Sequence, residues 1–375
     1  MKILVIGGAG FIGSHLVDAL THLGHQVLVL DVLHPQVHRL PEGRTNYMNQ
    51  HARLVKGDMR DLSVIDAVLE DAEVVFHLAA LTGSSQSMYN IREYMDINVM
   101  GTASLLQLLS QNRRHVRKLI LASSRAVYGE GFYDCHIHGE VEPPPRTLRQ
   151  LKQGQWEVRC PIGGCPVHPK PTSENKQLSP ASLYGITKLN QEQACLTIGQ
   201  SYNLPVVVLR LFNVYGSRQS LGNPYSNIFS IFTACLINGR SPEVYEDGCE
   251  SRDFIHVKDV VQAFLLAMQS DEADGQIFNV GSGEKISLLE LAKTLSERFG
   301  DRSPVVTGKS RAGDIRHCYA DLTRIKRALG FEPKVTLRAG IDEWFDHVSD
   351  RQCEDLSAFA ERELMVRGLI AQVHK

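Results

Sequence analysis

The sequence predicts an α/β protein in which a doubly wound parallel sheet is joined to a smaller α/β domain. Through the first half of the chain, short apolar runs of strand length alternate with segments whose apolar residues recur at helical spacing. This alternation is typical of parallel strands joined by helices that cover both faces of a sheet. A glycine-rich turn lies between the first strand and the first helix, and 375 residues are enough for one large or two ordinary domains.

The composition indicates a soluble globular protein, with 43% apolar and 22% charged residues. A formal net charge of −2 gives no indication of binding to nucleic acid or to a membrane surface. No apolar run reaches the roughly 18 residues of a membrane span, and the opening "MKILVIGGAG" is too short and glycine-rich for a signal peptide. The eight cysteines are spread over a large chain, as expected of reduced thiols, so we expect a cytoplasmic protein.

The first thirty residues predict a dinucleotide site. An apolar strand at Lys2 to Ile6 is followed by glycines at G-x-x-G-x-x-G spacing, Gly7, Gly10 and Gly13. These glycines let the backbone turn tightly and approach a pyrophosphate held at the N-terminus of the next helix. The second strand, "QVLVL", ends at Asp31, whose carboxylate can accept hydrogen bonds from both hydroxyls of an adenosine ribose and would repel a 2′-phosphate. A Rossmann unit that binds NAD in preference to NADP is therefore predicted.

The following segments continue the alternation. Strands are expected over residues 52–58, 72–80 and 118–124, and helices over residues 62–71 and 94–113. Ligands bind at the carboxyl ends of the strands in such a sheet. That edge is expected to collect Gly7, Asp31, Asp58, Ala79 and Ser123.

A candidate catalytic set follows. The segment "SPASLYGITKLNQEQACLTIG" is expected to form a helix on which Tyr184 and Lys188, four residues apart, share a face. A tyrosine titrates at about 10, but a lysine ammonium and a nicotinamide cation nearby would favour the phenolate. Lys188 could also hold the nicotinamide ribose, and a hydroxyl from Ser123 or Ser124 would hydrogen-bond the substrate oxygen that loses its proton. These groups predict an alcohol-oxidising site in which the tyrosine takes a proton and NAD takes a hydride.

Nearly the whole chain resembles the extended short-chain dehydrogenase/reductases of the NAD-dependent nucleotide-sugar epimerase/dehydratase family. The segments that carry this resemblance are "GGAGFIGSHL", "GDMRD", "FHLAA", "NVMGT", "SSRAVYG", "YGITK", "RLFNVYG", "RDFIHVKDV", "FNVGSG" and "RAGDIRHCYAD". The resemblance implies that Asp58 and Met59 flank the adenine, and that Asn98 and the backbone after Phe212 line the cofactor. Together with the motif it gives these expected cofactor-binding residues: Gly7, Gly10, Phe11, Ile12, Gly13, Asp31, Asp58, Met59, Leu78, Ala79, Ala80, Asn98, Ser123, Tyr184, Lys188 and Phe212.

The stretch "SSRAVYG" favours one reaction of this family over the others. The resemblance implies NAD-driven oxidation of a sugar carbon, usually C4, with Ser124 as the hydroxyl that contacts the substrate. In similar 4,6-dehydratases the next two positions are Asp-Glu, in decarboxylases a Glu precedes the Val, and in 3,5-epimerases a Cys lies in this stretch. Here the pair is Arg125-Ala126, which supplies no acid or base for elimination or α-proton exchange. Return of the hydride to the other face of the keto sugar, which is C4 epimerisation, is therefore expected, with Arg125 itself at the protein surface.

Two other functions stay open. A 4,6-dehydratase or 4-ketoreductase of the same fold would release a keto or reduced sugar. A non-catalytic NAD-binding protein would belong to another class, but it would not need to keep Tyr184, Lys188 and the serine.

The second half of the chain is expected to hold the nucleotide sugar. Asn213 resembles a family residue that contacts the sugar diphosphate, and Tyr245 one that stacks on the base. Arg252 and Arg311 can pair with a diphosphate, and Asp314 can hold a ribose hydroxyl. The substrate-binding residues expected are Ser124, Asn213, Tyr245, Arg252, Arg311 and Asp314.

Residues 130–180 form an insertion where the family usually has a short loop. It contains Cys135, His138, Cys160 and Cys165 in a C-x₂-H … C-x₄-C arrangement, and zinc takes four nitrogen or sulfur ligands from two close pairs. Similar insertions in the family carry C-x₂-C and C-P-x-C-G pairs. With a histidine in the first pair and a longer second spacing, we expect a degraded ribbon without a metal, and zinc is the alternative.

The insertion follows the serine strand, so we expect it to flank the sugar pocket. The resemblance of this insertion to those found in the family implies a dTDP-deoxyhexose or another unusual hexose as the sugar substrate. The chain is expected to divide into an NAD-binding domain, residues 1–216 and 251–285, and a nucleotide-sugar-binding domain, residues 217–250 and 286–375. The segment "DLSAFAERELMVRGLIAQV" is expected to form an amphipathic helix. The helices over residues 94–111 and 182–199 are apolar over much of their surface and resemble helices that pair in the family, so a homodimer is expected; packing in the core is the alternative.

Overall fold

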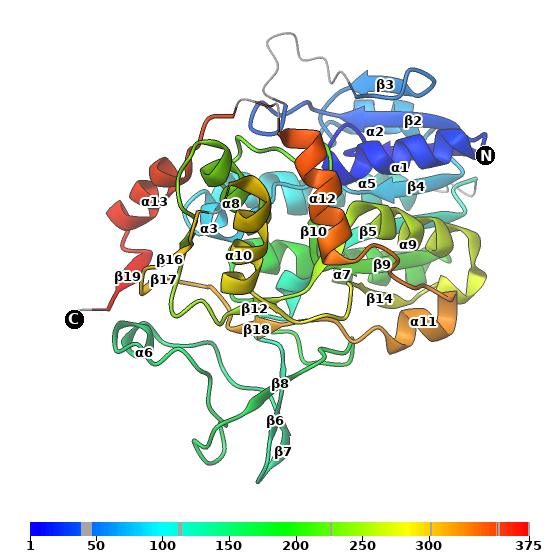
Figure 1. Cartoon of the computed structure of the whole chain (residues 1–375). Helices are drawn as coiled ribbons and strands as arrows, with labels where there is room; N and C mark the ends of the chain where they lie inside the picture. The colour runs from blue at the N-terminus through cyan, green and yellow to red at the C-terminus, as the bar shows by residue number, and fades with distance from the viewer. Residues whose placement is uncertain are drawn as a thin grey trace.

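The computed structural model describes residues 1–38, 47–111, 115–225, 227–300, 302–349, 351 and 353–373. Seven strands form its centre: β1 (Lys2–Ile6), β2 (Gln26–Asp31), β3 (Arg53–Lys56), β4 (Val74–His77), β5 (Lys118–Ser124), β9 (Val206–Leu211) and β14 (Ile277–Val280). They are parallel and lie in the order β14-β9-β5-β4-β1-β2-β3, which confirms the predicted sheet (Figure 1). The chain runs outward from β1 to β3 and then returns to β4. This reversal opens a crevice at the carboxyl ends of β1 and β4, where sheets of this kind bind ligands.

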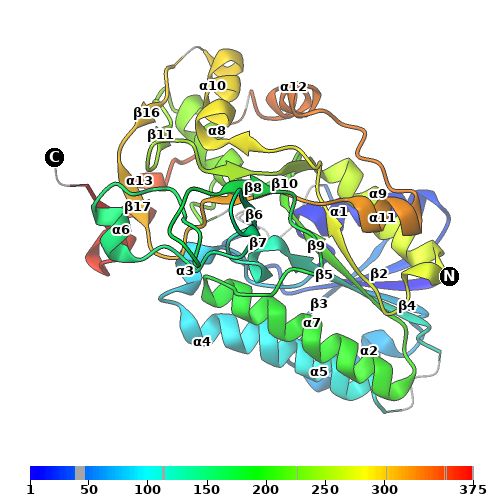
Figure 2. The ribbon, with the colours of Figure 1, turned by 90° about the horizontal axis from the view of Figure 1, so that it is seen from below.

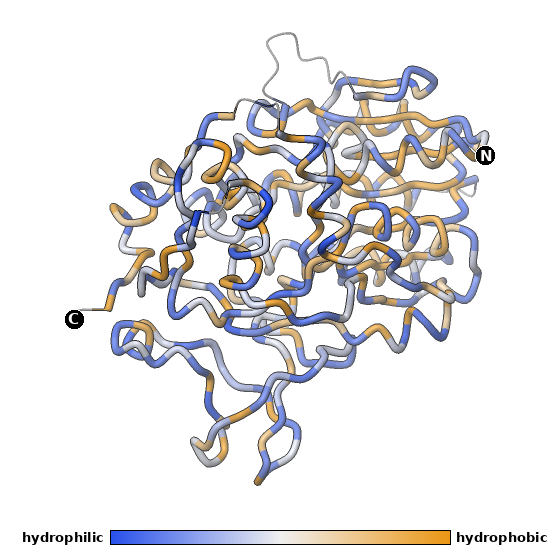
Figure 3. Tube along the Cα trace, viewed as in Figure 1, coloured by the Kyte–Doolittle hydropathy of each residue, from blue (hydrophilic) through white to orange (hydrophobic). Residues whose placement is uncertain are grey.

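Successive side chains of the central strands point into two separate cores. Along β1, Leu4 and Ile6 join the core beneath α2 (Leu62–Leu69), α5 (Gly101–Leu109) and α7 (Leu183–Tyr202). Ile3 and Val5 join the core beneath α1 (Phe11–His22), α9 (Val257–Gln269) and α11 (Thr323–Leu329). Figure 2 shows α2, α5 and α7 together on one side of the sheet. Figure 3 shows the apolar residues concentrated along the central strands, as expected of a parallel sheet covered on both faces.

One of the predicted helices is interrupted, and another agrees with the prediction. Residues 94–113 were expected to form one helix, of which residues 112 and 113 lie outside the described part of the chain. In the described part, α4 (Ile91–Tyr94) continues into a π-helical turn, η1 (Met95–Met100), and then into α5. α7 agrees well with prediction: its N-cap Ser182 accepts a hydrogen bond from the Gly185 backbone N–H at 3.2 Å. It ends at Asn203, whose left-handed backbone (φ 54°) stops the helix.

A second cluster of elements stands over the carboxyl edge of the sheet. It contains α8 (Ile228–Ile237), α10 (Leu288–Phe299), α12 (Leu337–Val348) and the short strands β10 (Asn213–Tyr215), β11 (Glu243–Val244), β12 (Ser251–Arg252), β13 (Phe254–His256), β15 (Ile286–Ser287), β16 (Val305–Val306) and β18 (His317–Cys318). Its core contains stacked or edge-on aromatic rings from Tyr215, Phe229 and Trp344. Three short helical turns also belong to the body of the protein: α3 (Ser84–Ser87), η2 (Arg125–Val127) and η3 (Asp271–Ala273).

The insertion forms an arm that projects from the body of the protein, at the bottom of Figure 1. It consists of β6 (Phe132–Cys135), β7 (Gly139–Val141), α6 (Leu148–Lys152) and β8 (His168–Lys170), and its three strands pair antiparallel in the order β7-β6-β8.

The last segment corrects one expectation. The predicted helix over residues 355–373 is shorter, α13 (Ser357–Val366), because Gly368 turns the chain with φ 68°. The chain continues as β19 (Ile370–Gln372), which pairs antiparallel with β17 (Lys309–Arg311). None of the helices in the described part of the chain has the length and apolar character needed to cross a bilayer.

Candidate active site

A cavity of about 740 Å³ opens at the carboxyl edge of the central sheet, within the roughly 300–1,000 Å³ of typical ligand sites. Nearly all the predicted site residues lie in its wall: Gly7, Gly10, Phe11, Ile12, Gly13, Asp31, Asp58, Met59, Leu78, Ala79, Ala80, Ser123, Ser124, Tyr184, Lys188, Phe212, Asn213, Arg252, Arg311 and Asp314. Two predicted residues, Asn98 and Tyr245, are outside that wall.

The glycine turn packs so closely that it excludes side chains at two of its three positions. A Cβ on Gly7 (φ 82°) would lie 2.6 Å from the backbone nitrogen of Ala79, and a Cβ on Gly13 would lie 2.2 Å from the carbonyl oxygen of Gly7. Gly10 is different: it is the N-cap of α1, and the nearest atom to its Cβ would be the Gly7 oxygen at 3.3 Å. Its open side faces the cavity, where the N–H groups at the start of α1 could hold a pyrophosphate.

Asp31 is held at the edge of the same cavity. Its carboxylate accepts hydrogen bonds from the backbone N–H groups of Ala9 at 3.0 Å and Leu33 at 2.9 Å. On the other flank, a bidentate contact with the Arg60 guanidinium holds the pKa of Asp58 below its usual value. The Asp58 carboxylate therefore stays negatively charged at neutral pH.

Asn98 lies beneath the cavity rather than in its wall. It is fully buried in the π-helical turn, where its amide bonds the N–H and the carbonyl of Leu81 at 2.7 and 3.0 Å. The same amide donates to the Thr187 hydroxyl at 3.0 Å, next to Lys188 on α7. Asn98 thus fixes the loop after β4 against the helix that carries the predicted catalytic pair.

Tyr184 and Ser124 meet in the cavity wall. Burial raises the pKa of Tyr184, and a hydrogen bond to Ser124 and the charge of Arg125 act in the opposite direction. The main-chain N–H of Tyr184 donates to the Ser87 hydroxyl at 3.0 Å, which ties this end of α7 to α3. The arrangement places a phenol and an aliphatic hydroxyl where one substrate oxygen can contact both.

Lys188 is buried close by, but its ammonium points to the main chain. Its Nζ donates to the carbonyl oxygen of Ala122 at 2.9 Å, and burial lowers its pKa to about 8. The sequence assigned the stabilisation of the Tyr184 phenolate to Lys188, whereas in the structure the cation that lowers the pKa of Tyr184 is Arg125.

The hydroxyl of Ser123 is engaged elsewhere. It donates to the carboxylate of Glu192, which forms a buried ion pair with Arg210 at 2.8 Å. Ser124 is one residue later, on the other face of β5. Its hydroxyl is therefore the one that can contact a ligand in the cavity.

Arg125 corrects a second expectation, because it is not a surface residue. Its side chain is half-buried in the cavity wall, and Nε donates to Oδ1 of Asn213 at 2.9 Å. Burial, together with the charge of Arg252, lowers its pKa to about 10. A cation thus stands beside Tyr184 at the position where the sequence offered no acid or base.

The predicted substrate residues are mostly brought together. Arg252 donates to the carbonyl oxygens of Ile315 and Arg316 at 2.7 and 3.0 Å, and Arg311 pairs with Asp314 at 3.0 Å. Tyr245 stands behind Arg311, whose guanidinium carbon is 5.0 Å from the ring centroid. Both arginines line the cavity, and the Tyr245 ring packs against Arg311.

Sequence analysis missed several residues of the wall. Residues 82–85, "TGSS", follow β4 and form one side of it, and Arg218, Asn223 and Asn227 close another. The pair Ser84-Ser85 had a usable signal, since it is a small polar pair in the segment that follows a buried strand, similar to the pair that ends β5. The four carboxylates among the described wall residues are Asp31, Asp58, Glu93 and Asp314, so none follows Ser124 directly.

Comparison with known proteins identifies the relatives of this chain. Residues 3–150 match the model of the NAD dependent epimerase/dehydratase family, and residues 165–344 match that of GDP-mannose 4,6 dehydratase. A dTDP-L-rhamnose 4-epimerase of Burkholderia thailandensis is 35% identical over 356 residues, which cover 94% of this chain and 96% of that protein. A putative UDP-glucose 4-epimerase of Methanocaldococcus jannaschii is 32% identical over 90% of this chain and 95% of its own length.

Solved structures with a similar fold lead to the same family. A UDP-glucose 4-epimerase of Thermotoga maritima, with UDP-glucose, has a TM-score of 0.75 and 31% identity, and the match covers 93% of this chain and 99% of that one. A UDP-glucuronic acid 4-epimerase variant of Bacillus cereus, in complex with NAD and a fluorinated UDP-sugar, has a TM-score of 0.76 at 26% identity over the same shares. On sequence, fold and cavity together, this chain belongs to the NAD-dependent epimerase/dehydratase family of extended short-chain dehydrogenase/reductases.

Proposed function

We propose that this protein is an isomerase that epimerises a nucleotide-activated sugar at C4 through a transient 4-keto intermediate, with NAD as its cofactor. The single observation that carries the proposal is the pairing of Tyr184 and Ser124 in the cavity wall, with Arg125-Ala126 immediately after Ser124 in the chain. The first two can exchange a proton with a sugar hydroxyl, and the next two offer no group for eliminating water or exchanging an α-proton.

NAD fits the first part of the cavity. The Gly7–Gly13 turn leaves room for a pyrophosphate at the start of α1, and Asp31 is fixed where a ribose would present its hydroxyls. Bound NAD supplies the hydride acceptor and later the donor, and its nicotinamide adds a positive charge that favours the phenolate. The Lys188 ammonium, held by Ala122 on one side, keeps two further N–H donors for the ribose of the nicotinamide.

The chain's own residues move the proton. The Tyr184 phenolate takes the proton of the C4 hydroxyl while Ser124 hydrogen-bonds the same oxygen, and the C4 hydrogen leaves as a hydride. Arg125 stabilises the phenolate that this step requires. After the keto sugar has turned its other face, Tyr184 returns its proton to the C4 oxygen as the hydride returns to carbon. The net reaction inverts C4 and consumes nothing.

The nucleotide sugar occupies the second part of the cavity. Arg252 and Arg311 supply the positive charge for its diphosphate, and Asn213 and Asp314 supply hydrogen-bonding groups beside them. The relatives named above act on dTDP-L-rhamnose, UDP-glucose and UDP-glucuronic acid by their names, and a dTDP-deoxyhexose or another unusual hexose is our proposed substrate class. We further propose the domain division 1–216 with 251–285 against 217–250 with 286–375, a homodimer, and a cytoplasmic location.

The test is proton NMR of the purified enzyme with NAD and a panel of nucleotide sugars that includes dTDP-L-rhamnose. A new anomeric signal with an altered H3–H4 coupling and no net NADH is expected. A 4-keto-6-deoxy product would instead establish a dehydratase, and accumulation of a reduced sugar would establish a ketoreductase.

A matched pair of variants then tests the assignment of the base. Tyr184→Phe should keep NAD affinity and lose about 10²–10⁴-fold in turnover. Tyr202→Phe, at the exposed end of the same helix, should behave as wild type. Unchanged turnover in Tyr184→Phe would remove the proton-transfer role from Tyr184, and an absence of turnover with every sugar in the wild type would favour a non-catalytic NAD-binding protein.

A further inference from the structure

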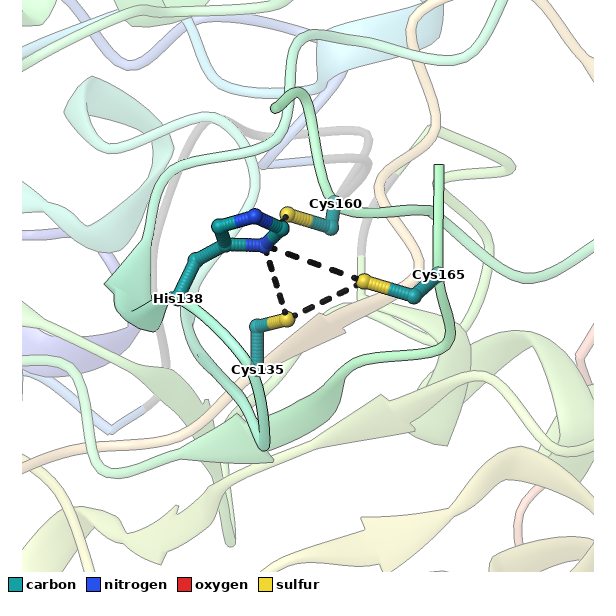
Figure 4. A group of neighbouring side chains, drawn as sticks. All are labelled: Cys135, His138, Cys160 and Cys165. Atoms are coloured by element: carbon teal, nitrogen blue, oxygen red, sulfur yellow. Dashed lines mark hydrogen bonds between the residues drawn. The ribbon is translucent and has the colours of Figure 1, made fainter. Parts of the chain in front are cut away.

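Four metal-ligating side chains meet in the insertion, away from the catalytic cavity. Their ligand atoms, the sulfurs of Cys135, Cys160 and Cys165 and a ring nitrogen of His138, all lie within 4.8 Å of one another (Figure 4). We propose that these four residues bind one zinc ion and that this ion holds the insertion in shape.

The distances match a tetrahedral ion. His138 Nδ1 is 3.4, 3.3 and 3.9 Å from the sulfurs of Cys135, Cys160 and Cys165, and the Cys135 and Cys165 sulfurs are 3.2 Å apart. With Zn–S of about 2.3 Å and Zn–N of about 2.0–2.1 Å, tetrahedral angles place nitrogen and sulfur about 3.5 Å apart and two sulfurs about 3.8 Å apart. The nitrogen is thus already at coordination spacing, and the closest sulfur pair needs to open by about 0.6 Å. Three thiolates and an imidazole are a set that selects zinc over magnesium or calcium, which prefer oxygen.

Two tight turns deliver the ligands in facing pairs. Cys135 pairs with Gly139 across β6 and β7, and the turn between them carries His138 and directs the N–H groups of Ile137 and His138 at the Cys135 sulfur. In the other turn, Cys160 and Cys165 are joined by a backbone hydrogen bond of 3.0 Å.

A glycine lets these two turns approach each other. A Cβ on Gly163 would lie 2.7 Å from Cε1 of His138, so any larger residue there would displace the His138 ring. The C-x₄-C spacing led to the expectation of a degraded site without metal. It does not separate the ligands, however, because the turn of four residues still brings Cys165 back to Cys160.

The arm has little else to hold it together. Its hydrophobic cluster contains five buried residues, Tyr133, Cys135, Val141, Val158 and Cys160, two of which are the proposed ligands. A segment that cannot bury a core of ordinary size is typically held by a metal or disulfides. The described cysteines are free thiols, so a metal is the cross-link that the structure provides for.

The proposed ion also fixes a contact between the arm and the body of the protein. Glu157, three residues before Cys160, pairs with the fully buried Arg316 at 2.5 Å. Arg146, also in the arm, pairs with Glu246 at 2.6 Å, and Arg316 bonds the same Glu246 at 2.9 Å. Arg316 follows Asp314 and Ile315 in the chain. The loop that carries the cavity residues Arg311 and Asp314 is therefore in contact with the arm. Zinc is thus assigned a structural role, without contact to the reacting sugar.

The test measures metal and not turnover, so its result does not depend on the proposed reaction. The untagged wild-type protein, purified without chelator, should contain one zinc per chain by mass spectrometry and release it when a mercurial blocks the thiols. Replacement by cobalt(II) should give thiolate-to-metal charge-transfer absorption and the intense visible bands of a tetrahedral cobalt centre.

Variants of the four residues sharpen the test. Cys160→Ser and His138→Ala should lose more than tenfold of the bound zinc, whereas His138→Cys, which restores a four-ligand set, should keep it. His136→Ala, two residues away, and Cys249→Ser, an exposed cysteine elsewhere, are matched controls that should keep one zinc per chain.

Three results would each overturn the proposal. Less than 0.1 zinc per chain after incubation of the reduced protein with excess Zn²⁺ would show that no site exists. Six free thiols in place of eight in the denatured, unreduced protein would indicate a Cys135–Cys165 disulfide instead of an ion. Full zinc content in both Cys160→Ser and His138→Ala would place the metal elsewhere. Because the cobalt spectrum is recorded on the wild type, poor folding of a variant leaves the proposal open to refutation.

Discussion

Two alanine substitutions in the glycine turn should separate folding from NAD binding. At Gly13 a new methyl group would lie 2.2 Å from the Gly7 oxygen and 2.7 Å from the Gly8 Cα, both backbone atoms. Carbon needs about 3.4 Å or more from such neighbours, so α1 would have to move by about 1 Å relative to the turn. Overpacking of this kind costs about 1–3 kcal/mol of unfolding free energy.

Gly10→Ala is the matched variant, because the same methyl group would meet only the Gly7 oxygen, at 3.3 Å. The loss of a glycine N-cap costs less than about 1 kcal/mol, so the melting temperature of the nucleotide-free protein should hardly change. The methyl group would, however, occupy the side of the turn that faces the cavity. We expect NAD affinity to fall at least tenfold, which corresponds to about 1.4 kcal/mol.

The assay is thermal unfolding and NAD titration calorimetry on protein freed of bound nucleotide. The melting temperature of Gly13→Ala should be several degrees below that of wild type. Gly10→Ala should have the melting temperature of wild type but bind NAD weakly. Wild-type NAD affinity in Gly10→Ala would refute the placement of the pyrophosphate at this turn. Wild-type stability in Gly13→Ala would refute the packing argument.

Three further predictions concern buried charge. Arg125→Gln removes the cation that lowers the pKa of Tyr184, so the acid limb of the pH profile of kcat/KM should move to higher pH by up to about one unit; an unmoved limb would contradict this role. Burial raises the pKa of Glu250 to about 8, so in wild type the folded state keeps a proton that the unfolded state loses, and stability falls as pH rises from about 4.5 to about 8. Glu250→Gln should lose this pH dependence of stability, so the melting temperature of the variant minus that of wild type should grow from pH 5 to about pH 8.5. A difference that stays constant with pH would contradict the raised pKa of Glu250. Glu192→Gln leaves Arg210 buried without its partner and should cost about 3–5 kcal/mol in urea unfolding, against less than about 1 kcal/mol for Glu73→Gln at the half-exposed pair with Arg117.

Local patterns made most of the fold predictable. The strand Lys2–Ile6, the glycine spacing and Asp31 belong to one continuous segment, so their geometry depends on neighbours in the chain. The N-cap of α7 at Ser182 is likewise readable from its immediate context, and with it the common face of Tyr184 and Lys188. Period-two alternation of apolar residues was hidden, because strands buried on both faces read as continuous apolar runs.

The roles that could not be read from the sequence depend on contacts between distant residues. Arg125 is drawn inward by Asn213, 88 positions later, and the hydroxyl of Ser123 is taken by Glu192, 69 positions later. One signal was available: Arg210 interrupts the apolar run "VVVLRLF", and a charge in a buried strand requires a partner of opposite sign. The distance between the two cysteine turns likewise depends on how the arm folds, which ligand spacing alone does not specify.

The two ends of the insertion lie against each other. A Cβ on Gly129 would be 2.0 Å from the carbonyl oxygen of Ser179, so the chain leaves and re-enters the catalytic domain at practically one point. A loop closed at its base adds only about 0.6 kcal/mol of closure entropy for each doubling of its length, whatever it contains. Ser124 and Tyr184 stand on either side of this junction, and the sheet and α7 position them independently of the segment between. The fold can therefore accept or exchange a module of almost any size beside its active site, and substrate choice can change there while the chemistry stays as it is.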